Sequence, residues 1–411
     1  MKKQLILLVM ILLPMVASAY DFALENSDGV TIYYNYILNG KETELEVTSF
    51  NPYYHNSYNK NVVIPEEVTY MNRTLKVTHI GSYAFYKCTG LTSVTIPNSV
   101  ISIDEGAFRN CSVLTSLNIP NSVMSIGTSA FEDCSVLTSL NIPNSVMFIG
   151  SYAFRNCSGL TSVIIPNSVT SIEEHTFQNC TGLTSVTIPN SVKSIEASSF
   201  YNCSGLTSVI IPNSVTSIGY NAFCNCSGLT SVTIPNSVIS IVHDAFRNCS
   251  GLTSVIIPNS VTSIGYNAFD GINLTFVISQ IENPFNITGK SSSHPTFSLN
   301  TYNNATLYVP KGTSDKYKAA KGWKDFLYIE EGITNIISNV PANAVLMRSQ
   351  NGTITIQGVD EGEQVSVFGI NGTQAGTSVS QNGAAIVNTT LQPGSIAIVK
   401  IGQKSVKVVI K

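Results

Sequence analysis

The sequence predicts a mainly β repeat protein, a solenoid of 23-residue coils with a parallel sheet on one face, followed by a small C-terminal β-sandwich. Three observations support this prediction. The segment Ile-Pro-Asn-Ser-Val recurs eight times at a spacing of 23 residues. Charged residues make up only 11% of the 411 residues, whereas hydrophobic residues make up 43%. Near residue 332 the period stops, and short runs of alternating apolar and polar residues begin.

The repeated segment belongs to a longer unit, which reads L-T-S-V-x-I-P-N-S-V-x-S-I-x-x-x-A-F-x-N-C-S-G. The first isoleucine of the segment falls at Ile96, Ile119, Ile142, Ile165, Ile188, Ile211, Ile234 and Ile257. A period of about 20–29 residues around an L-x-x-L-x-L core is typical of a leucine-rich-repeat solenoid. Because one coil cannot bury its own apolar side chains, successive coils must stack to form the core.

Each position of the unit has a predicted structural role, as the coil that begins at Leu160 illustrates. Alternation places Val163 and Ile165 on the inner side of a short strand, which pairs with parallel strands of neighbouring coils. Pro166 ends this strand because it has no N–H to donate. The Asn167 side chain is expected to bond backbone groups of the turn that follows. The Ala-Phe and Cys positions are expected to close the opposite wall as a turn or a short helix.

The low charge restricts both the fold and the partners. In a ladder of similar coils, like charges would repeat about every 4.8 Å and repel one another. The faces of the ladder are therefore built from Ser, Thr and Asn. A net charge of −3 with only 22 Lys and Arg residues lacks the basic surface that binds phosphate backbones, so nucleic acid is excluded as a partner.

Four segments are predicted along the chain: a signal peptide (1–19), an N-terminal cap (20–60), the solenoid with its closing cap (61–331) and a C-terminal β-sandwich (332–411). The first segment has two lysines, an apolar run at 5–16 and the small residues Ala17-Ser18-Ala19, as an export signal does. That run is too short for a membrane span, and no second apolar stretch is long enough. We therefore expect a protein that is secreted or displayed on the outer cell surface, without a transmembrane segment.

The eight repeat units with their A-F-x-x-C segments resemble the BspA-like leucine-rich-repeat surface proteins of the Bacteroidetes. Residues 62–68 and 75–78 look like the opening coil of that family, and residues 307–312 with Tyr317 and Trp323 look like its closing cap. The resemblance implies a surface adhesin or interaction scaffold, whose partners are proteins or glycans of host or bacterial surfaces.

The C-terminal segment is predicted to contain short strands separated by tight turns. Alternating runs occupy 353–357, 364–368, 385–387, 395–401 and 405–410. Asn-Gly pairs at 351, 371 and 382 favour hairpin turns. Residues 365–369, 394–399 and 404–411 resemble the C-terminal sorting domain of type IX secretion, which implies passage across the outer membrane and surface attachment. The alternative is an ordinary accessory β-domain.

Eight of the nine cysteines occupy the same position in successive coils and are expected to be free thiols in the core: Cys88, Cys111, Cys134, Cys157, Cys180, Cys203, Cys226 and Cys249. Side chains in register point the same way, which disfavours disulfides between coils. No histidine joins this column, so no metal site is predicted. Cys224 occupies a position that holds Arg, Glu, Gln or Tyr in other coils, so we expect an exposed thiol there, either reactive or a tolerated substitution.

No enzymatic constellation is found, and no catalytic residue, cofactor or metal is predicted. The five histidines share no metal-ligand spacing, and the sequence has neither a nucleophile elbow nor a phosphate-binding loop. Glu173 and Glu196 are one repeat apart and should stack on neighbouring coils. They are interpreted as a solvated turn near Lys193, although a cation site or an acid–base pair is the alternative.

The outward positions of the repeated strands are the predicted binding site. They are Ser162, Ile164, Ser185, Thr187, Ser208, Ile210, Ser231, Thr233, Ser254 and Ile256. From Ile164 onward, isoleucine alternates with threonine, and regularly spaced exposed isoleucines on an uncharged sheet suggest a contact stripe for a protein or a glycan. The alternative is that the alternation only records a duplication, since residues 203–223 recur unchanged at 249–269.

A second functional hypothesis assigns specificity to the ends of the array. The solenoid would then be a passive stalk or a surface-layer component, and the partner would contact the N-terminal cap or the 271–306 insertion. The cap is rich in tyrosine, with Tyr33, Tyr34, Tyr36, Tyr53, Tyr54 and Tyr58. These rings would either stack on a ligand or cover the apolar end of the first coil.

Overall fold

The computed structural model of the chain describes residues 20–37, 44–50, 57–332, 346–350, 353–357, 359, 362–369, 373–381, 384–392, 396–401 and 404–409. The chain forms two compact units, which divide between Glu331 and Gly332. The predicted signal peptide and the three Asn-Gly pairs of the C-terminal segment lie outside the described residues.

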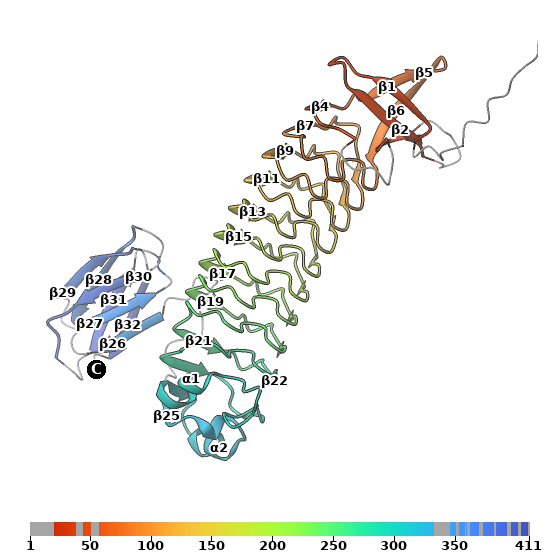
Figure 1. Ribbon diagram of the computed structural model, residues 1–411. Coiled ribbons are helices and arrows are strands. Elements are labelled where there is room, and N and C mark those ends of the chain that lie inside the picture. The colour runs from red at the N-terminus through yellow and green to blue at the C-terminus, as the bar shows by residue number, and fades with distance from the viewer. Residues whose placement is uncertain are drawn as a thin grey trace, which may run out of the picture. The chain divides into compact units, whose positions relative to one another are not determined.

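The first unit is the predicted solenoid, in which each repeat coil contributes a short strand just before its Ile-Pro dipeptide (Figure 1). This series, the first ladder, comprises β4 (Val62–Val63), β7 (Val94–Thr95), β9 (Ser116–Asn118), β11 (Ser139–Asn141), β13 (Ser162–Ile164), β15 (Ser185–Thr187), β17 (Ser208–Ile210), β19 (Ser231–Thr233) and β21 (Ser254–Ile257). Paired strands are parallel and one repeat apart, so that Ile164 pairs with Thr187. Val163 and Ile165 point inward and are each 2% exposed, as the alternation predicts.

A second series of parallel strands, the second ladder, lies across the core from the first, at the Ser-Ile dipeptide of the repeat unit, which is Phe-Ile in β12 (Figure 1). It comprises β6 (Arg73–Ile80), β8 (Ser102–Ile103), β10 (Ser125–Ile126), β12 (Phe148–Ile149), β14 (Ser171–Ile172), β16 (Ser194–Ile195), β18 (Ser217–Ile218), β20 (Ser240–Ile241) and β22 (Ser263–Ile264). Buried isoleucines such as Ile172, which pairs with Ile195, face inward. The solenoid therefore has strands on two sides of its core, where the repeat pattern predicted one. The strands of the second ladder were not predicted, because a strand of two residues is too short to show an alternation of apolar and polar residues.

The Ala-Phe and Cys positions form turns that close the core, as predicted. From Phe108 to Phe297, the phenylalanine rings of successive coils stack within 10° of parallel, at centroid distances of 5.3–5.5 Å. From Cys111 to Cys249, each thiol of the column donates to the phenylalanine carbonyl of the preceding coil, as Cys180 Sγ does to Phe154 O at 3.1 Å. All nine cysteines are free and buried, which confirms the prediction for the eight-residue column.

The N-terminal end of the solenoid is covered by strands that extend the sheet of the second ladder. These strands are β1 (Phe22–Glu25), β2 (Thr31–Tyr36), β3 (Glu44–Thr48) and β5 (Glu67–Tyr70), which join β6 in one sheet. Tyr34 and Tyr58 are buried, and the Tyr58 ring packs on Phe85 at 4.6 Å. These two tyrosines therefore cover the first coil, whereas Tyr33 and Tyr36 are half-buried, and Tyr53 and Tyr54 lie outside the described residues.

The C-terminal end of the solenoid is closed by three further parallel strands and three short helices. These are β23 (Phe276–Ser279), α1 (Leu299–Asn304), β24 (Thr306–Val309), α2 (Ser314–Ala319), η1 (Trp323–Asp325) and β25 (Tyr328–Glu331). The buried Trp323 ring lies 6.0 Å from Phe297, the last ring of the stack, and its Nε1 donates to Phe285 O. Among the described residues, no helix is long and apolar enough to cross a membrane.

The second unit consists of two antiparallel sheets around a separate core. One sheet has the order β26 (Leu346–Gln350), β27 (Thr353–Gln357), β30 (Ala384–Asn388). The other has the order β29 (Gln374–Val379), β28 (Gln364–Gly369), β31 (Ile396–Ile401), β32 (Lys404–Val409). Residues such as Ile356 and Val367 bring the two sheets into one core, which confirms the β-sandwich. The strands β26 and β29 were not predicted, because neither has a regular alternation of apolar residues.

Candidate binding site

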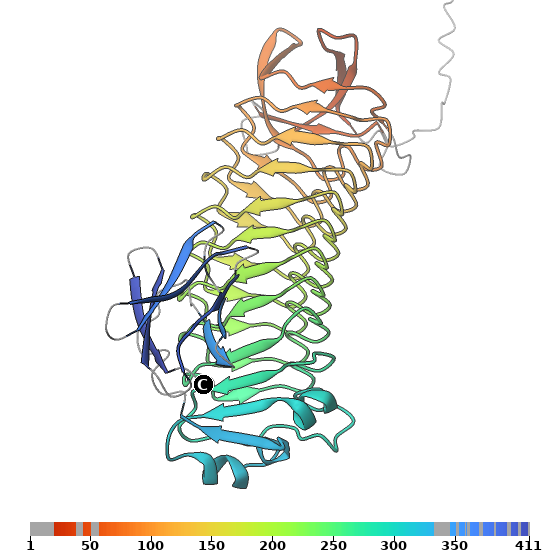
Figure 2. The same ribbon diagram turned by 90° about the vertical axis from the view of Figure 1, so that its left-hand side faces the viewer.

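All ten predicted binding residues lie in strands of the first ladder, which run side by side in Figure 2, and the alternation of buried and less buried residues places them on its outward side. Seven of them are exposed: Ser162, Ile164, Ser185, Thr187, Ser208, Ile210 and Ser231. Thr233, Ser254 and Ile256 are half-buried. Ile164 is 69% and Ile210 49% exposed, so two of the three isoleucines present a large apolar surface to solvent.

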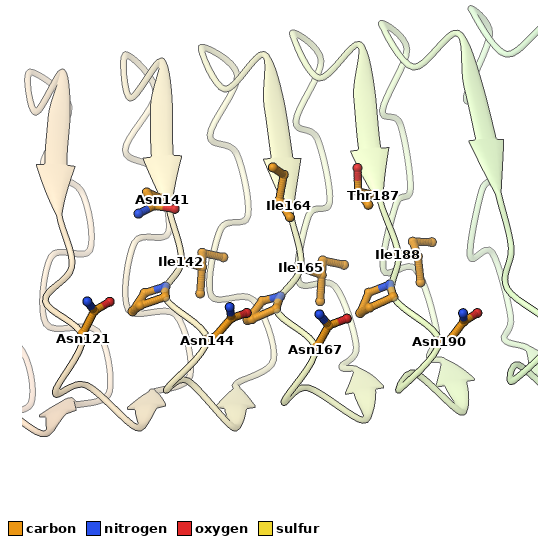
Figure 3. A pocket seen from close by; sticks show the side chains of 13 residues that line it. Asn121, Asn141, Ile142, Asn144, Ile164, Ile165, Asn167, Thr187, Ile188 and Asn190 are labelled. Atoms are coloured by element: carbon orange, nitrogen blue, oxygen red, sulfur yellow. The ribbon is translucent and has the colours of Figure 1, made fainter. Parts of the chain in front are cut away.

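A shallow groove of about 550 Å³ lies along the ends of strands β11, β13 and β15 (Figure 3). Isoleucines and prolines of the Ile-Pro dipeptides form its floor. One wall consists of Asn141, Ile164 and Thr187, the last outward residues of the three strands. The other wall is a row of asparagines, Asn121, Asn144, Asn167 and Asn190. The lining contains no charged residue, and the groove runs across the coils rather than along one of them.

The asparagines of this row, the outer asparagine column, do not have the structural role that the sequence predicted. The turn after Pro166 is closed by the backbone, because Val169 N donates to Pro166 O at 3.0 Å. The Asn167 side chain is exposed instead. In the part of the chain that the structure describes, the four groove asparagines form no side-chain hydrogen bond. Their amides are available to a ligand.

A second row of asparagines, the inner asparagine column, lies beside the cysteines and behaves in the opposite way. Asn179 Nδ2 donates to Asn156 Oδ1 at 2.8 Å, and Asn202 Nδ2 donates to Asn179 Oδ1 at 3.0 Å. The same bond joins Asn248 to Asn225 at 2.9 Å. These residues adopt the left-handed backbone conformation, with φ of 61° at Asn179, which asparagine tolerates better than most residues. Their amides are used within the protein.

The outer asparagines were missed as site residues because a turn position explains asparagine equally well. The available signal was their recurrence in all eight units, although a type I turn accepts many residues at its second position. The outer strand residues were found because period-two alternation identifies which side chains leave the core. No such rule tells which turn side chains lack a partner.

The prediction of an exposed thiol at Cys224 is wrong. The side chain is 5% exposed, and burial raises its pKa to about 11. The equivalent positions of the adjacent coils carry Tyr201 and Arg247, whose longer side chains reach the solvent on either side of the short cysteine. This position of the coil is therefore only partly exposed to solvent: a long polar side chain reaches the solvent from it, whereas a short side chain is covered by its neighbours.

The same position forms an ion-pair ladder near the N-terminal end. The Glu132 carboxylate lies 3.0 Å from Arg109 Nε and 3.2 Å from Arg155 Nη1, in the preceding and following coils. The Glu132 side chain is 4% exposed, whereas each arginine is 35% exposed. The two arginines therefore shield the carboxylate from solvent and neutralise its charge. Because both partners belong to the protein, we interpret these ion pairs as structural.

The other titratable residues do not assemble into a site. Glu173 and Glu196 are half-buried on neighbouring coils. Across the described ranges, no group of three or more His, Cys, Asp or Glu side chains is placed to hold one metal ion. The chemistry of the exposed first-ladder face is therefore that of amides, hydroxyls and aliphatic groups.

Three solved structures of leucine-rich-repeat proteins are similar to the chain. A leucine rich cell surface protein from Faecalibacterium prausnitzii A2-165 is 28% identical over 76% of this chain and 95% of its own, with a TM-score of 0.48. A leucine-rich repeat protein from Bacteroides ovatus ATCC 8483 is 24% identical over 76% of this chain and 100% of its own, with a TM-score of 0.42. The T. pallidum leucine rich repeat protein is 24% identical over 58% of this chain and 86% of its own, with a TM-score of 0.37.

No curated protein matches the sequence. The family described as the BspA type leucine rich repeat region, in six copies, matches residues 78–191 and 170–291. Together these matches span the coils that carry both ladders, the groove and the two asparagine columns. Because they cover more than half of its residues, the chain belongs to the BspA-type leucine-rich-repeat family.

Proposed function

We propose that the protein is a secreted or cell-surface interaction scaffold, an adhesin that binds a protein or a glycan of a host or bacterial surface. The observation that supports this is the outward face of the first ladder, where exposed, uncharged side chains repeat from coil to coil beside a groove with unpaired amides. A scaffold of this kind presents the same contact several times, which increases the strength of attachment without a single specialised site.

Export to the surface is part of the same proposal. Residues 1–19 would direct the chain out of the cytoplasm, and the β-sandwich from residue 332 onward would act as a sorting domain of the type IX kind. The solenoid would then be displayed with the first-ladder face open to partners. Membership in the BspA-type family supports a surface role, since the resemblance to that family implies display and adhesion.

The test is a triple variant, Ile164→Ser, Ile210→Ser and Ile256→Ser, measured for binding to immobilised host matrix proteins and surface glycans. We expect the variant to lose at least about tenfold in affinity, because it removes apolar contact area in three places. The matched control is Met124→Ser, Met147→Ser and Ile239→Ser, which removes three exposed apolar side chains outside the first ladder and should leave binding intact. Unchanged binding by the first-ladder variant, with fold and secretion preserved, would contradict the proposal.

The alternative, a passive stalk with specificity in the caps, has one observation in its favour. In the N-terminal cap the rings of Tyr33 and Phe50 lie 5.4 Å apart, and Phe50 is 50% exposed. Deletion of two whole coils, residues 182–227, separates the hypotheses. Binding that survives at full strength assigns the partner to the ends, whereas a loss that grows with the number of deleted coils assigns it to the array.

A further inference from the structure

We propose that the groove beside the outer asparagine column binds a neutral, extended, β-linked polysaccharide, with about one sugar residue for each coil. This inference rests on the proposed function and names the class of ligand. It is based on three properties of the groove: the availability of its amides, its repeat distance and its lack of charge.

The asparagine amides have the bonding capacity that a sugar requires. Each amide can donate two hydrogen bonds and accept at its oxygen, and each hydroxyl of a sugar can both donate and accept. The groove asparagines form no side-chain hydrogen bond with the described protein, although asparagines of the equally spaced inner column bond from coil to coil at three places. The outer amides therefore lack partners because of where they lie in the coil, since the same residue type forms hydrogen bonds in the inner column.

The floor of the groove complements the other face of a sugar ring. Ile142, Ile165, Ile188 and the prolines that follow them lie between the two polar walls, and because all six residues are largely buried, only the edges of their aliphatic groups reach the groove. A pyranose ring has an apolar face of C–H groups and a rim of hydroxyls. Such a ring can rest on the floor while its rim meets Asn144 or Asn167 on one side and Asn141 or Thr187 on the other (Figure 3).

The repeat distance favours a polysaccharide over an extended peptide. Successive coils advance by 5.3–5.5 Å at the phenylalanine stack, and paired parallel strands lie about 4.8 Å apart. One pyranose residue advances an extended β-linked chain by a similar distance, so each sugar would meet an equivalent set of groups. A peptide in extended conformation advances only about 3.3 Å per residue and would fall out of step with the coils.

The charge of the groove selects a neutral chain. Its lining consists of Asn, Ile, Pro and Thr. A uronic acid or sulfated polysaccharide would therefore bring anionic groups to a surface that offers no cation to pair with them. Hydrogen bonds between neutral groups must supply the affinity, so we expect weak binding per sugar that strengthens with the number of coils engaged.

The experiment uses the full chain and a series of β-linked gluco-oligosaccharides of increasing length, with titration calorimetry as the measurement. Affinity should rise with each added sugar at least as far as the tetrasaccharide. Dextran, whose linkages prevent the extended form, and polygalacturonate, which is charged, should bind much more weakly. Equal binding of all lengths, or tighter binding of polygalacturonate, would overturn the inference.

The decisive variant is Asn144→Ala, Asn167→Ala and Asn190→Ala. Loss of three neutral hydrogen-bonding positions should weaken oligosaccharide binding by about tenfold to a hundredfold. The matched control, Thr170→Ala, Thr216→Ala and Thr262→Ala, changes three exposed residues that precede the strands of the second ladder and should leave the affinity unchanged. An unchanged affinity in the asparagine variant would refute the site.

A separate outcome distinguishes this inference from the proposed function. If the protein binds none of the neutral oligosaccharides but still captures a matrix protein through the residues Ile164, Ile210 and Ile256, the polysaccharide inference is wrong and the scaffold function stands. If neither class of ligand binds to the folded, exported chain, both are wrong.

Discussion

The two asparagine columns of the solenoid have the same composition and the same spacing, yet they differ in what their side chains do. In the inner column, amides bond to the amide of the adjacent coil, as Asn179 does to Asn156, Asn202 to Asn179 and Asn248 to Asn225. In the outer column Asn167 and its neighbours are exposed and form no such bonds. A repeated polar residue is therefore structural where neighbouring copies satisfy one another, and it is available for binding where they do not.

The largest effect is expected at the wall that the inner column shares with the ring stack. Phe177→Ala would remove a ring that is 1% exposed and stacks on Phe154 and Phe200 at 5.4 Å on both sides. We expect the free energy of unfolding to fall by about 3–5 kcal/mol. Because each coil contacts only its neighbours, denaturation followed by circular dichroism should also become less cooperative. A loss below about 1 kcal/mol would show that the stack contributes little.

The next effect is expected in the inner column itself. Asn179→Ala would remove two hydrogen bonds between coils and place alanine at a φ of 61°. The lost bonds and the left-handed conformation together predict a destabilisation of about 2–3 kcal/mol. Asn179→Gly separates the two contributions, since glycine adopts this conformation freely and should recover part of the loss. Equal stability of the alanine variant and the native protein would contradict this account.

A smaller effect, confined to alkaline pH, is expected at Cys224. Burial raises its pKa from an ordinary value of 9.0 to about 11 and that of Cys180 to about 12. The folded state thus holds the thiol proton more tightly than the unfolded state, so this stabilisation is complete below pH 9 and is lost as the pH rises toward the folded pKa. Thermal melts should show a falling melting temperature over that range.

The labelling of the native protein tests the same point about Cys224. Iodoacetamide should modify no cysteine of the column at neutral pH, and Cys224 should be the first to react as the pH is raised, since the others are less exposed. A Cys224→Ala variant serves as the control, because it should lack this first reaction. Rapid labelling of Cys224 at neutral pH would show that its thiol is exposed, as the sequence analysis expected, and would contradict its burial.

The smallest effect on stability is expected in the outer column. Asn167→Ala removes an exposed side chain without a partner in the described structure, so the free energy of unfolding should change by less than about 0.5 kcal/mol. The pair Asn167→Ala and Asn179→Ala, measured side by side, is the direct test of the comparison. If both substitutions destabilise the protein equally, the distinction between the two columns fails.

The repeat period, the first ladder and the buried cysteine column followed from the sequence because they depend only on which residues recur and on alternation. The second ladder did not, since two residues such as Ser171 and Ile172 are too few to show a period. The strands at 346–350 and 374–379 could not be predicted from the sequence either, because they form by pairing with neighbouring strands and show no regular alternation of apolar residues.

The candidate site was predicted in part for the same reason. Alternation identified Ile164 and Thr187 as outward residues, but it carries no information on the turn beside them. Whether Asn167 bonds its own turn depends on the backbone geometry after Pro166, where Val169 N already closes the turn. The exposure of Cys224 was predicted wrongly because it depends on the side chains of adjacent coils rather than on its position within the unit.

The ion-pair ladder has a consequence for the way in which this chain folds. Coils that are nearly identical can stack in the wrong order, with one coil skipped, at little cost in apolar contacts. Glu132 is shielded by Arg109 and Arg155, which occupy the same position in the coils immediately before and after it. Skipping the coil of Arg109 or that of Arg155 would replace one of these partners with the uncharged Tyr86 or Gln178 beside a buried carboxylate, so the ion pairs favour the correct stacking order of these three coils.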